Sequence, residues 1–166
     1  SSVMKQRYDL CALFGPEHGI RGAAQAGGHD NESFCDPETG VPVYDLFAHG
    51  DAREKTGAVL SSLDAVVFDI QDIGVRYYTY QYTMLDAMRI CKNAGIPFIV
   101  LDRINPLGGV RVEGNCIDED CISGVGAVKG QPAVAGMTVG ELARNDDADF
   151  DIKIAFFVLT QIFDAL

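Results

Sequence analysis

Three side chains that could do chemistry stand close together near the start of the chain, in residues 14–22 (FGPEHGIRG). Glu17 supplies a carboxylate, His18 an imidazole and Arg21 a guanidinium. The glycines and the proline around them predict a turn rather than a helix interior. Open α/β sheets bind ligands outside the carboxyl ends of their strands, and the apolar run 9–14 before this turn predicts such a strand. These residues are therefore the first candidate for an active site, against the alternative of a solvated surface loop.

A strand, a helix and a second strand are predicted in the middle of the chain. Residues 65–68 form a β-branched and aromatic run typical of a buried strand, and residues 97–101 form another. Between them a helix is predicted from about residue 80 to 93, ended by Gly95. Apolar residues that recur at helical spacing mark the side of this helix that faces the sheet: Met84, Leu85, Met88 and Cys91. Short connections between these elements predict a right-handed βαβ crossover and hence a parallel sheet.

Both of these strands are followed by polar residues, as the first one is. The residues after the two strands are Asp69, Gln71 and Asp72, then Asp102, Arg103 and Asn105. If all three strands belong to one parallel sheet, the three turns lie at one edge of it, and we expect their side chains to form one site. Structural ion pairs and turn-capping carboxylates are the competing explanation for the same residues.

The remaining elements are predicted more coarsely. Residues 22–40 are polar and glycine-rich and predict a long loop, which in a compact domain is often a functional lid. Residues 41–44 predict a short edge strand, where Pro42 is tolerated, and residues 56–63 a helix with Ala58, Leu60 and Leu63 on its inner side. Cys11 and Cys91 stand in apolar runs and are predicted to be buried.

Composition limits the classes of function. The chain has 166 residues, of which 48% are hydrophobic and 22% charged, as in an ordinary globular domain. Its net charge of −11 and isoelectric point near 4.5 argue against nucleic acid or an anionic membrane as the partner. No apolar run approaches the ~20 residues that span a bilayer, and the first residues lack the order of a signal peptide.

Several kinds of active site can be set aside. The chain has neither a glycine-rich dinucleotide loop nor a Walker-type phosphate loop, so no nucleotide cofactor is expected. It has no G-x-S-x-G elbow, and two residues rather than one separate Asp69 from Asp72, unlike the aspartate pair of haloacid-dehalogenase phosphatases. The five cysteines match neither a disulfide framework nor a zinc pattern, so they predict no metal site.

The carboxylates that remain suit glycoside cleavage by a carboxyl pair, or metal-assisted hydrolysis. In glycoside cleavage one carboxyl group must donate a proton to the leaving oxygen. Glu17 is the predicted general acid, because its long side chain leaves a turn bounded by glycine and proline. Asp72 is the predicted partner, with Asp69 and Asp102 as second choices.

Other residues are predicted to bind the ligand. His18 and Arg21 could hold a carboxylate or an acetamide group, since the arginine fork suits a carboxylate. Tyr77, Tyr78 and Tyr80 could stack on a sugar ring, although at least one of them is expected in the core. The polar residues of the later turns complete the predicted substrate-binding set: Asp69, Gln71, Asp102 and Asn105.

Four segments in order resemble the exo-β-N-acetylmuramidase family, of the NamZ or YbbC type: residues 14–22, 67–80, 102–109 and 136–143. The resemblance implies a Rossmann-like α/β catalytic domain that releases N-acetylmuramic acid from the non-reducing ends of peptidoglycan fragments, without a cofactor. It maps the family's catalytic glutamate onto Glu17 and gives the lactyl carboxylate of muramic acid a partner among Arg21, Arg76 and Arg103. It also implies an exported protein.

The sequence departs from the family in its ends. The resemblance implies a further strand and helix before residue 1, and a C-terminal domain after the Rossmann-like domain, here residues 1–143. Residues 144–166 are read as an acidic linker and an apolar segment. The leading hypothesis is therefore a partial or divergent glycosidase, and the alternatives are a non-catalytic remnant that binds cell-wall sugars or a partner, and a metal-dependent hydrolase.

Overall fold

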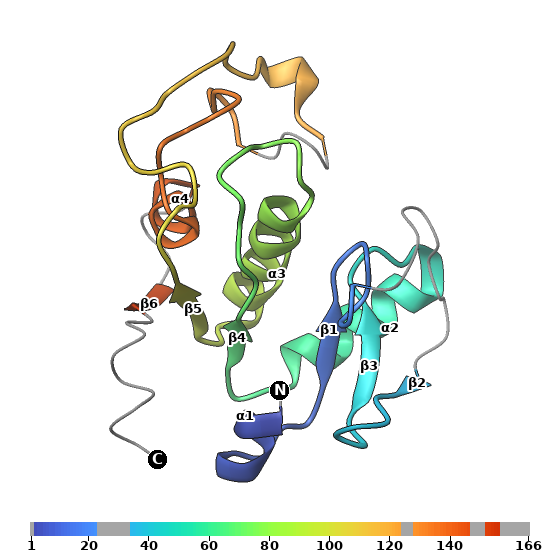
Figure 1. Cartoon of the computed structure of the whole chain (residues 1–166). Helices are drawn as coiled ribbons and strands as arrows, with labels where there is room; N and C mark the ends of the chain where they lie inside the picture. The colour runs from blue at the N-terminus through green and yellow to red at the C-terminus, as the bar shows by residue number, and fades with distance from the viewer. Residues whose placement is uncertain (1, 23–33, 124–127, 147–151, 157–166) are drawn as a thin grey trace, which may run out of the picture. The chain divides into compact units, whose positions relative to one another are not determined.

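The structure is a computed structural model that describes residues 2–22, 34–123, 128–146 and 152–156 (Figure 1). The chain divides into two compact units, Ser1–Leu63 and Asp64–Leu166, and each is described by itself. Within the described residues, no helix has both the length and the apolar character needed to cross a membrane.

The first unit is a small sheet with two helices. Its elements are α1 (Ser2–Arg7), β1 (Leu13–Gly15), β2 (Phe34–Cys35), β3 (Pro42–Asp45) and α2 (Gly50–Ser61). The strand order is β1-β3-β2, with β1 parallel to β3 and β2 antiparallel to it. The prediction that residues 41–44 form an edge strand is wrong, because β3 lies in the centre of this sheet. Pro42 is tolerated there as the first residue of the strand.

Two further predictions in this unit need correction. The helix expected at residues 56–63 begins earlier, at Gly50, and ends at Ser61. Leu60 is buried in this helix as predicted, but Ala58 is exposed. The buried residue one turn before Leu60 is Thr56. Cys11 is exposed, because β1 begins only at Leu13 and the segment before it pairs with no strand of the described residues.

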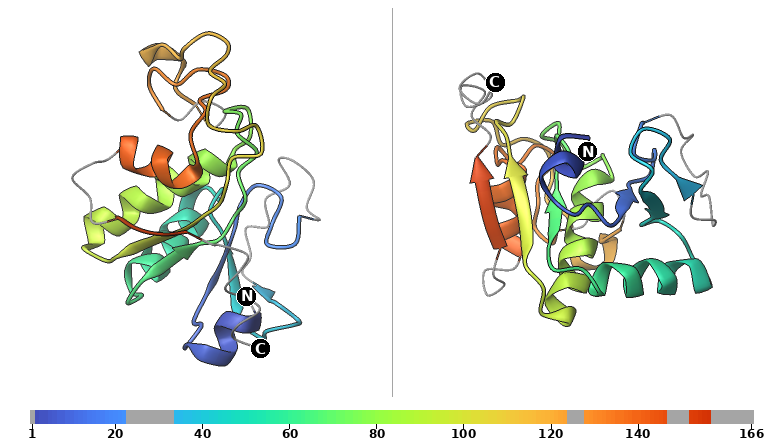
Figure 2. Two further views of the ribbon diagram at one scale, coloured as in Figure 1. Left: turned by 60° about the vertical axis from the view of Figure 1, so that its left-hand side comes forward. Right: turned by 90° about the horizontal axis from the view of Figure 1, so that it is seen from below.

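The second unit contains a fully parallel sheet. Its elements are β4 (Val66–Phe68), α3 (Tyr80–Ala94), β5 (Phe98–Asp102), the 3₁₀ turn η1 (Glu119–Cys121), α4 (Val139–Asp146) and β6 (Ile152–Phe156). The strand order is β4-β5-β6, and both pairings are parallel. The helices α3 and α4 pack against each other, side by side on the same side of the sheet (Figure 2). The predicted α/β fold with a parallel sheet and flanking helices is confirmed.

The βαβ crossover β4-α3-β5 agrees closely with its sequence pattern. Met84, Leu85, Met88 and Cys91 are all buried on one side of α3. Gly95 ends the helix in the left-handed conformation, with φ of 71°, which glycine adopts without steric cost. Phe98 and Val100 alternate with partly exposed residues along β5 and complete the core of this unit.

The expectation that three strand ends meet at one edge is only partly correct. In the described residues β1 pairs with β3, in a sheet separate from that of β4 and β5, so the strand pairings do not join its turn to the turns after β4 and β5. The ends of β4 and β5 do lie at the same edge, because these two strands are parallel neighbours. The candidate residues therefore fall into two groups, one in each unit.

The predicted boundary at residue 143 stays a prediction, but the structure adds two observations around it. α4 continues through Arg144 to Asp146, and β6 pairs with β5 along its whole length. Part of the predicted acidic linker, residues 147–149, lies outside the described residues.

Candidate active site

The turn that carries Glu17 follows β1 directly, as predicted. The N–H of Gly19 donates to the carbonyl of Pro16 at 2.7 Å, and the N–H of Leu46 donates to the carbonyl of Gly15 at 3.2 Å. These bonds close the turn and attach its start to the end of β3. Glu17 and His18 are both partly exposed at its tip.

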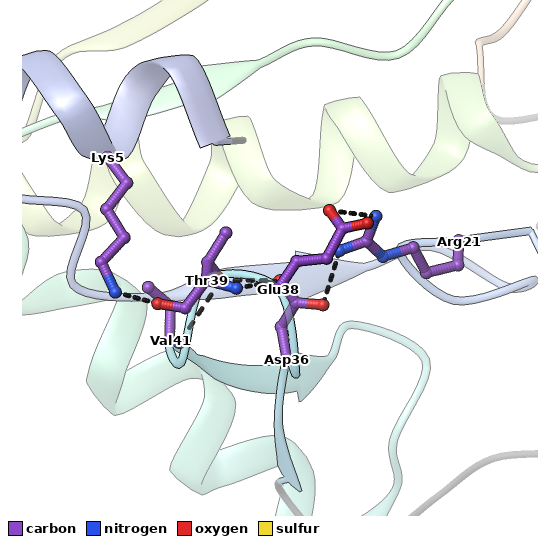
Figure 3. Close-up of polar contacts among 6 residues, drawn as sticks. All are labelled: Lys5, Arg21, Asp36, Glu38, Thr39 and Val41. Carbon is purple, nitrogen blue, oxygen red and sulfur yellow. Dashed lines mark hydrogen bonds and ion pairs between the residues drawn. The ribbon is translucent and has the colours of Figure 1, made fainter.

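Arg21 lies at the end of this segment and is held by two carboxylates (Figure 3). Its Nη2 lies 2.7 Å from Oδ1 of Asp36, and its Nη1 lies 2.7 Å from Oε2 of Glu38. The sequence predicts that Arg21 binds a ligand carboxylate or acetamide, whereas in the structure its charge is already matched within the first unit. Its partners Asp36 and Glu38 are not among the residues predicted to form the site.

Asp36 is fully buried, and its hydrogen bonds offset the cost of burying a carboxylate. Oδ2 accepts hydrogen bonds from the hydroxyl of Thr39 at 2.6 Å and from the N–H of Thr39 at 3.1 Å. These bonds, together with the Arg21 guanidinium, lower the pKa of Asp36 to about 2. The turn is further tied to α1, because Nζ of Lys5 donates to the carbonyl of Thr39. An aspartate three residues before a threonine, in a Pro-Gly turn, is the local signal that could have indicated this residue.

In the second unit, Asp72 is buried with its two oxygens in different environments. Oδ2 accepts from the N–H of Gly74 at 2.9 Å and from Nε2 of Gln81 at 3.0 Å. Oδ1 is buried and has no hydrogen-bond partner among the described residues. Gln81 in turn accepts from Nε2 of Gln131 at 2.8 Å, and Oε1 of Gln131 is likewise buried without a partner.

The turns after β4 and β5 touch each other, as expected for parallel neighbours. Asp69 forms an ion pair with Arg103. Nε2 of Gln71 donates to the carbonyl of Asp72 at 2.6 Å and, more weakly, to that of Ile104 at 3.5 Å. The structure therefore brings together the polar residues of these two turns, while half of the Asp69 side chain remains exposed.

Asp102, at the end of β5, is fully buried and directed at the start of α4. Its Oδ1 accepts from the N–H of Gly140 at 3.0 Å, and its Oδ2 accepts from the hydroxyl of Thr138 at 2.6 Å. Thr138 and Glu141 form a capping box, because each side chain accepts from the other's backbone N–H. A side chain on Gly140 would place its Cβ 2.6 Å from Oδ2 of Asp102, so only glycine fits there.

Asn105 is also engaged within the protein. Its Nδ2 donates to the carbonyl of Met137 at 2.8 Å, and its Oδ1 accepts from the N–H of Leu107 at 2.8 Å. Among the four carboxylates named for the reaction, Asp102 has both oxygens bonded and Asp69 is ion-paired. Asp72 is the buried carboxylate with one oxygen that no described residue bonds. The roles of these residues toward a substrate stay predictions.

Arg76 and the tyrosines stand on the long connection between β4 and α3. Nη1 of Arg76 donates to the carbonyls of Asn115 at 2.5 Å and Gln131 at 2.9 Å. Its guanidinium lies 5.4 Å from the ring centroid of Tyr77. Tyr77 and Tyr78 are exposed, and Tyr80 begins α3.

The fold and these turns define a Rossmann-like α/β domain with acidic side chains after its strands. The sequence profile described as the N-terminal part of exo-β-N-acetylmuramidase NamZ matches residues 1–162. The chain belongs to this family, as its motifs predicted. The match extends past residue 143, where the resemblance was expected to fade, and includes β6.

Curated and solved relatives agree with this assignment. The chain is 50% identical over 143 residues to the peptidoglycan β-N-acetylmuramidase NamZ of Bacillus subtilis strain 168. These aligned residues make up 86% of this chain and 34% of that protein. Two crystal structures of DUF1343 family proteins from Bacteroides fragilis are similar to it. The first has a TM-score of 0.73 and 40% identity, and the match covers 89% of this chain and 37% of the other chain. The second has a TM-score of 0.69 and 32% identity, and the match covers 93% of this chain and 40% of the other chain. The chain thus spans about a third of the length of the curated relative.

Proposed function

We propose that the chain belongs to a glycosidase that releases N-acetylmuramic acid from the non-reducing ends of peptidoglycan fragments. The observation that carries this proposal is the 50% identity over 143 residues to a peptidoglycan β-N-acetylmuramidase. The position of Glu17 supports it, because the turn of residues 16–19 lies at the end of a strand and its backbone is closed by hydrogen bonds.

Glu17 is the proposed general acid. In glycoside cleavage the acid gives its proton to the glycosidic oxygen as the bond from that oxygen to C1 breaks, and positive charge develops on the sugar ring. Glu17 stands at the partly exposed tip of its turn, where a substrate oxygen can reach it. The ion pairs of Arg21 with Asp36 and Glu38 hold the end of the same turn in place.

Asp72 is the proposed partner carboxylate, which acts as nucleophile, base or electrostatic stabiliser. Its contacts favour it over Asp69 and Asp102. The amide of Gln81 and the N–H of Gly74 fix one oxygen, and the other oxygen is left without a protein donor among the described residues. A carboxylate held at one oxygen keeps a fixed orientation, and its other oxygen retains lone pairs that no described protein donor uses.

Of the remaining predicted site residues, His18, Gln71 and Tyr78 are proposed to bind the sugar. His18 stands beside the acid, and Gln71 lies between the turns after β4 and β5. Tyr78 presents an exposed ring on which a sugar can stack.

The test is hydrolysis of a chromogenic β-N-acetylmuramide by the wild-type chain and by Glu17→Gln. We expect the substitution to remove turnover, because the glutamine amide has no acidic proton to transfer, and Asp72→Asn to lower it strongly. Glu54→Gln, at an exposed position of α2, is the matched control and should keep wild-type activity. Turnover by Glu17→Gln at the wild-type rate would refute the assignment.

Two further outcomes separate the alternatives. Loss of wild-type activity on addition of a chelator would favour a metal-dependent hydrolase. Calorimetric binding of N-acetylmuramic acid without any turnover would favour a sugar-binding protein.

A further inference from the structure

The proposed substrate carries a negative charge that this protein must accommodate. N-Acetylmuramic acid differs from N-acetylglucosamine by a lactyl ether whose carboxylate is ionised at neutral pH. The chain itself has a net charge of −11, so its overall field repels such a ligand. A local cation that is not already neutralised is therefore needed to bind the carboxylate.

Two of the three arginines that the motifs suggest are already paired with acids. Arg21 has two carboxylate partners, Asp36 and Glu38. An additional anion at Arg21 would meet more negative than positive charge. Arg103 forms its ion pair with Asp69, so a ligand carboxylate would have to compete with that aspartate.

Arg76 is different, because its described partners are neutral. Both hydrogen bonds of its side chain come from Nη1 and go to backbone carbonyls, those of Asn115 and Gln131. No carboxylate pairs with Arg76 within the described residues, and its Nε and Nη2 have no hydrogen-bond partner there. These two nitrogens form the edge of the guanidinium that matches the two oxygens of a carboxylate.

The surroundings of Arg76 fit a sugar-binding position. The two carbonyls and the ring of Tyr77 hold the guanidinium in place. The Arg76 side chain therefore loses less conformational entropy when a ligand binds. Tyr78, with its exposed ring, is the second residue after it. Gln131, whose carbonyl holds Arg76, is joined through Gln81 to Asp72. The arginine and the proposed partner carboxylate therefore belong to one network inside the second unit.

We propose that Arg76 binds the lactyl carboxylate of N-acetylmuramic acid through its Nε and Nη2 edge. It thereby sets the preference of the enzyme for muramic acid over glucosamine ends. This inference rests on the proposed function and goes beyond it, because it selects one arginine for the group that distinguishes the two sugars.

The test compares two ligands that differ only in charge, N-acetylmuramic acid and its lactyl methyl ester. Calorimetry on the wild-type chain should give tighter binding of the acid than of the ester. Arg76→Ala should weaken binding of the acid by about 10- to 100-fold, the range of one charged hydrogen-bond contact, and leave the ester unchanged. Arg76→Lys keeps the charge without the fork and should show a smaller loss.

Controls make each outcome decisive. Arg111→Ala removes an exposed arginine paired with Glu113 and should bind both ligands as the wild type does. Should Arg76→Ala fail to fold, Arg76→Lys gives the same comparison. Equal weakening of acid and ester would mean that Arg76 only supports the structure, and unchanged binding of the acid would mean that it does not touch the carboxylate; either result overturns the inference. Wild-type binding of neither ligand would instead contradict the proposed function.

Discussion

Replacing Asp102 by alanine tests how the second unit is held together. Asp102 is fully buried and accepts three hydrogen bonds, from the N–H of Arg103, the N–H of Gly140 and the hydroxyl of Thr138. Removing the carboxylate leaves buried donors without an acceptor, each at a cost of about 1–3 kcal/mol. Since three donors each lose one acceptor, the total is about 3–5 kcal/mol, toward the lower end of that range. We expect a loss of unfolding free energy of that size.

The assay is thermal unfolding followed by circular dichroism. For a domain of this length, 1 kcal/mol corresponds to about 2–4 °C, so the Asp102→Ala midpoint should fall by about 6–20 °C. Asp69→Ala is the matched control at the end of the neighbouring strand. Its side chain is 48% exposed in an ion pair with Arg103, and such pairs contribute about 0–1 kcal/mol. Equal midpoints for the two variants would refute the view that Asp102 caps α4.

Two more predictions concern titration and thiol chemistry. The pKa of Asp36 is lowered from 3.8 to about 2 in the folded chain, so its ionised form adds stability above pH ~4 that is lost as the pH falls toward 2. In urea titrations the difference in unfolding free energy between wild type and Asp36→Asn should therefore be constant above pH ~4 and shrink below it. A difference that grew on acidification would contradict this prediction. Burial raises the pKa of the Cys91 thiol to about 12, so an aromatic disulfide reagent should not label Cys91 in the native chain. Labelling is read by mass spectrometry, and rapid labelling of native Cys91 would show that this thiol is not buried. The reagent should label the four exposed cysteines: Cys11, Cys35, Cys116 and Cys121.

The βαβ crossover could be predicted from sequence because its signals are local. The spacing of Met84, Leu85, Met88 and Cys91 fixes the buried side of α3, and Gly95 fixes its end. The partner of β1 could not be predicted in the same way. Any apolar run is compatible with several neighbours, and the choice of β3 depends on contacts between segments distant along the chain.

In the candidate site, too, the features set by local sequence could be predicted and those set by distant contacts could not. The turns after β4 and β5 were placed together correctly, since parallel pairing of their strands determines where they end. Asp36 was missed because its partner Arg21 stands 15 positions earlier, and no periodicity links the two. The capping box of Thr138 and Glu141 could have been recognised from their spacing, but the role of Asp102 in it depends on the fold.

The contact of Asp102 with α4 has a consequence for the order of folding. α4 has 8 residues, fewer than the ~12–15 that an isolated helix needs to be marginally stable in water. One of the acceptors for its first turn is supplied by β5, 38 positions earlier in the chain. α4 therefore gains its full stability only once β5 has docked beside β4, and β6 follows α4 in the chain. We therefore expect the last helix and strand of the second unit to assemble on the crossover β4-α3-β5, so that slow formation of the crossover would delay both.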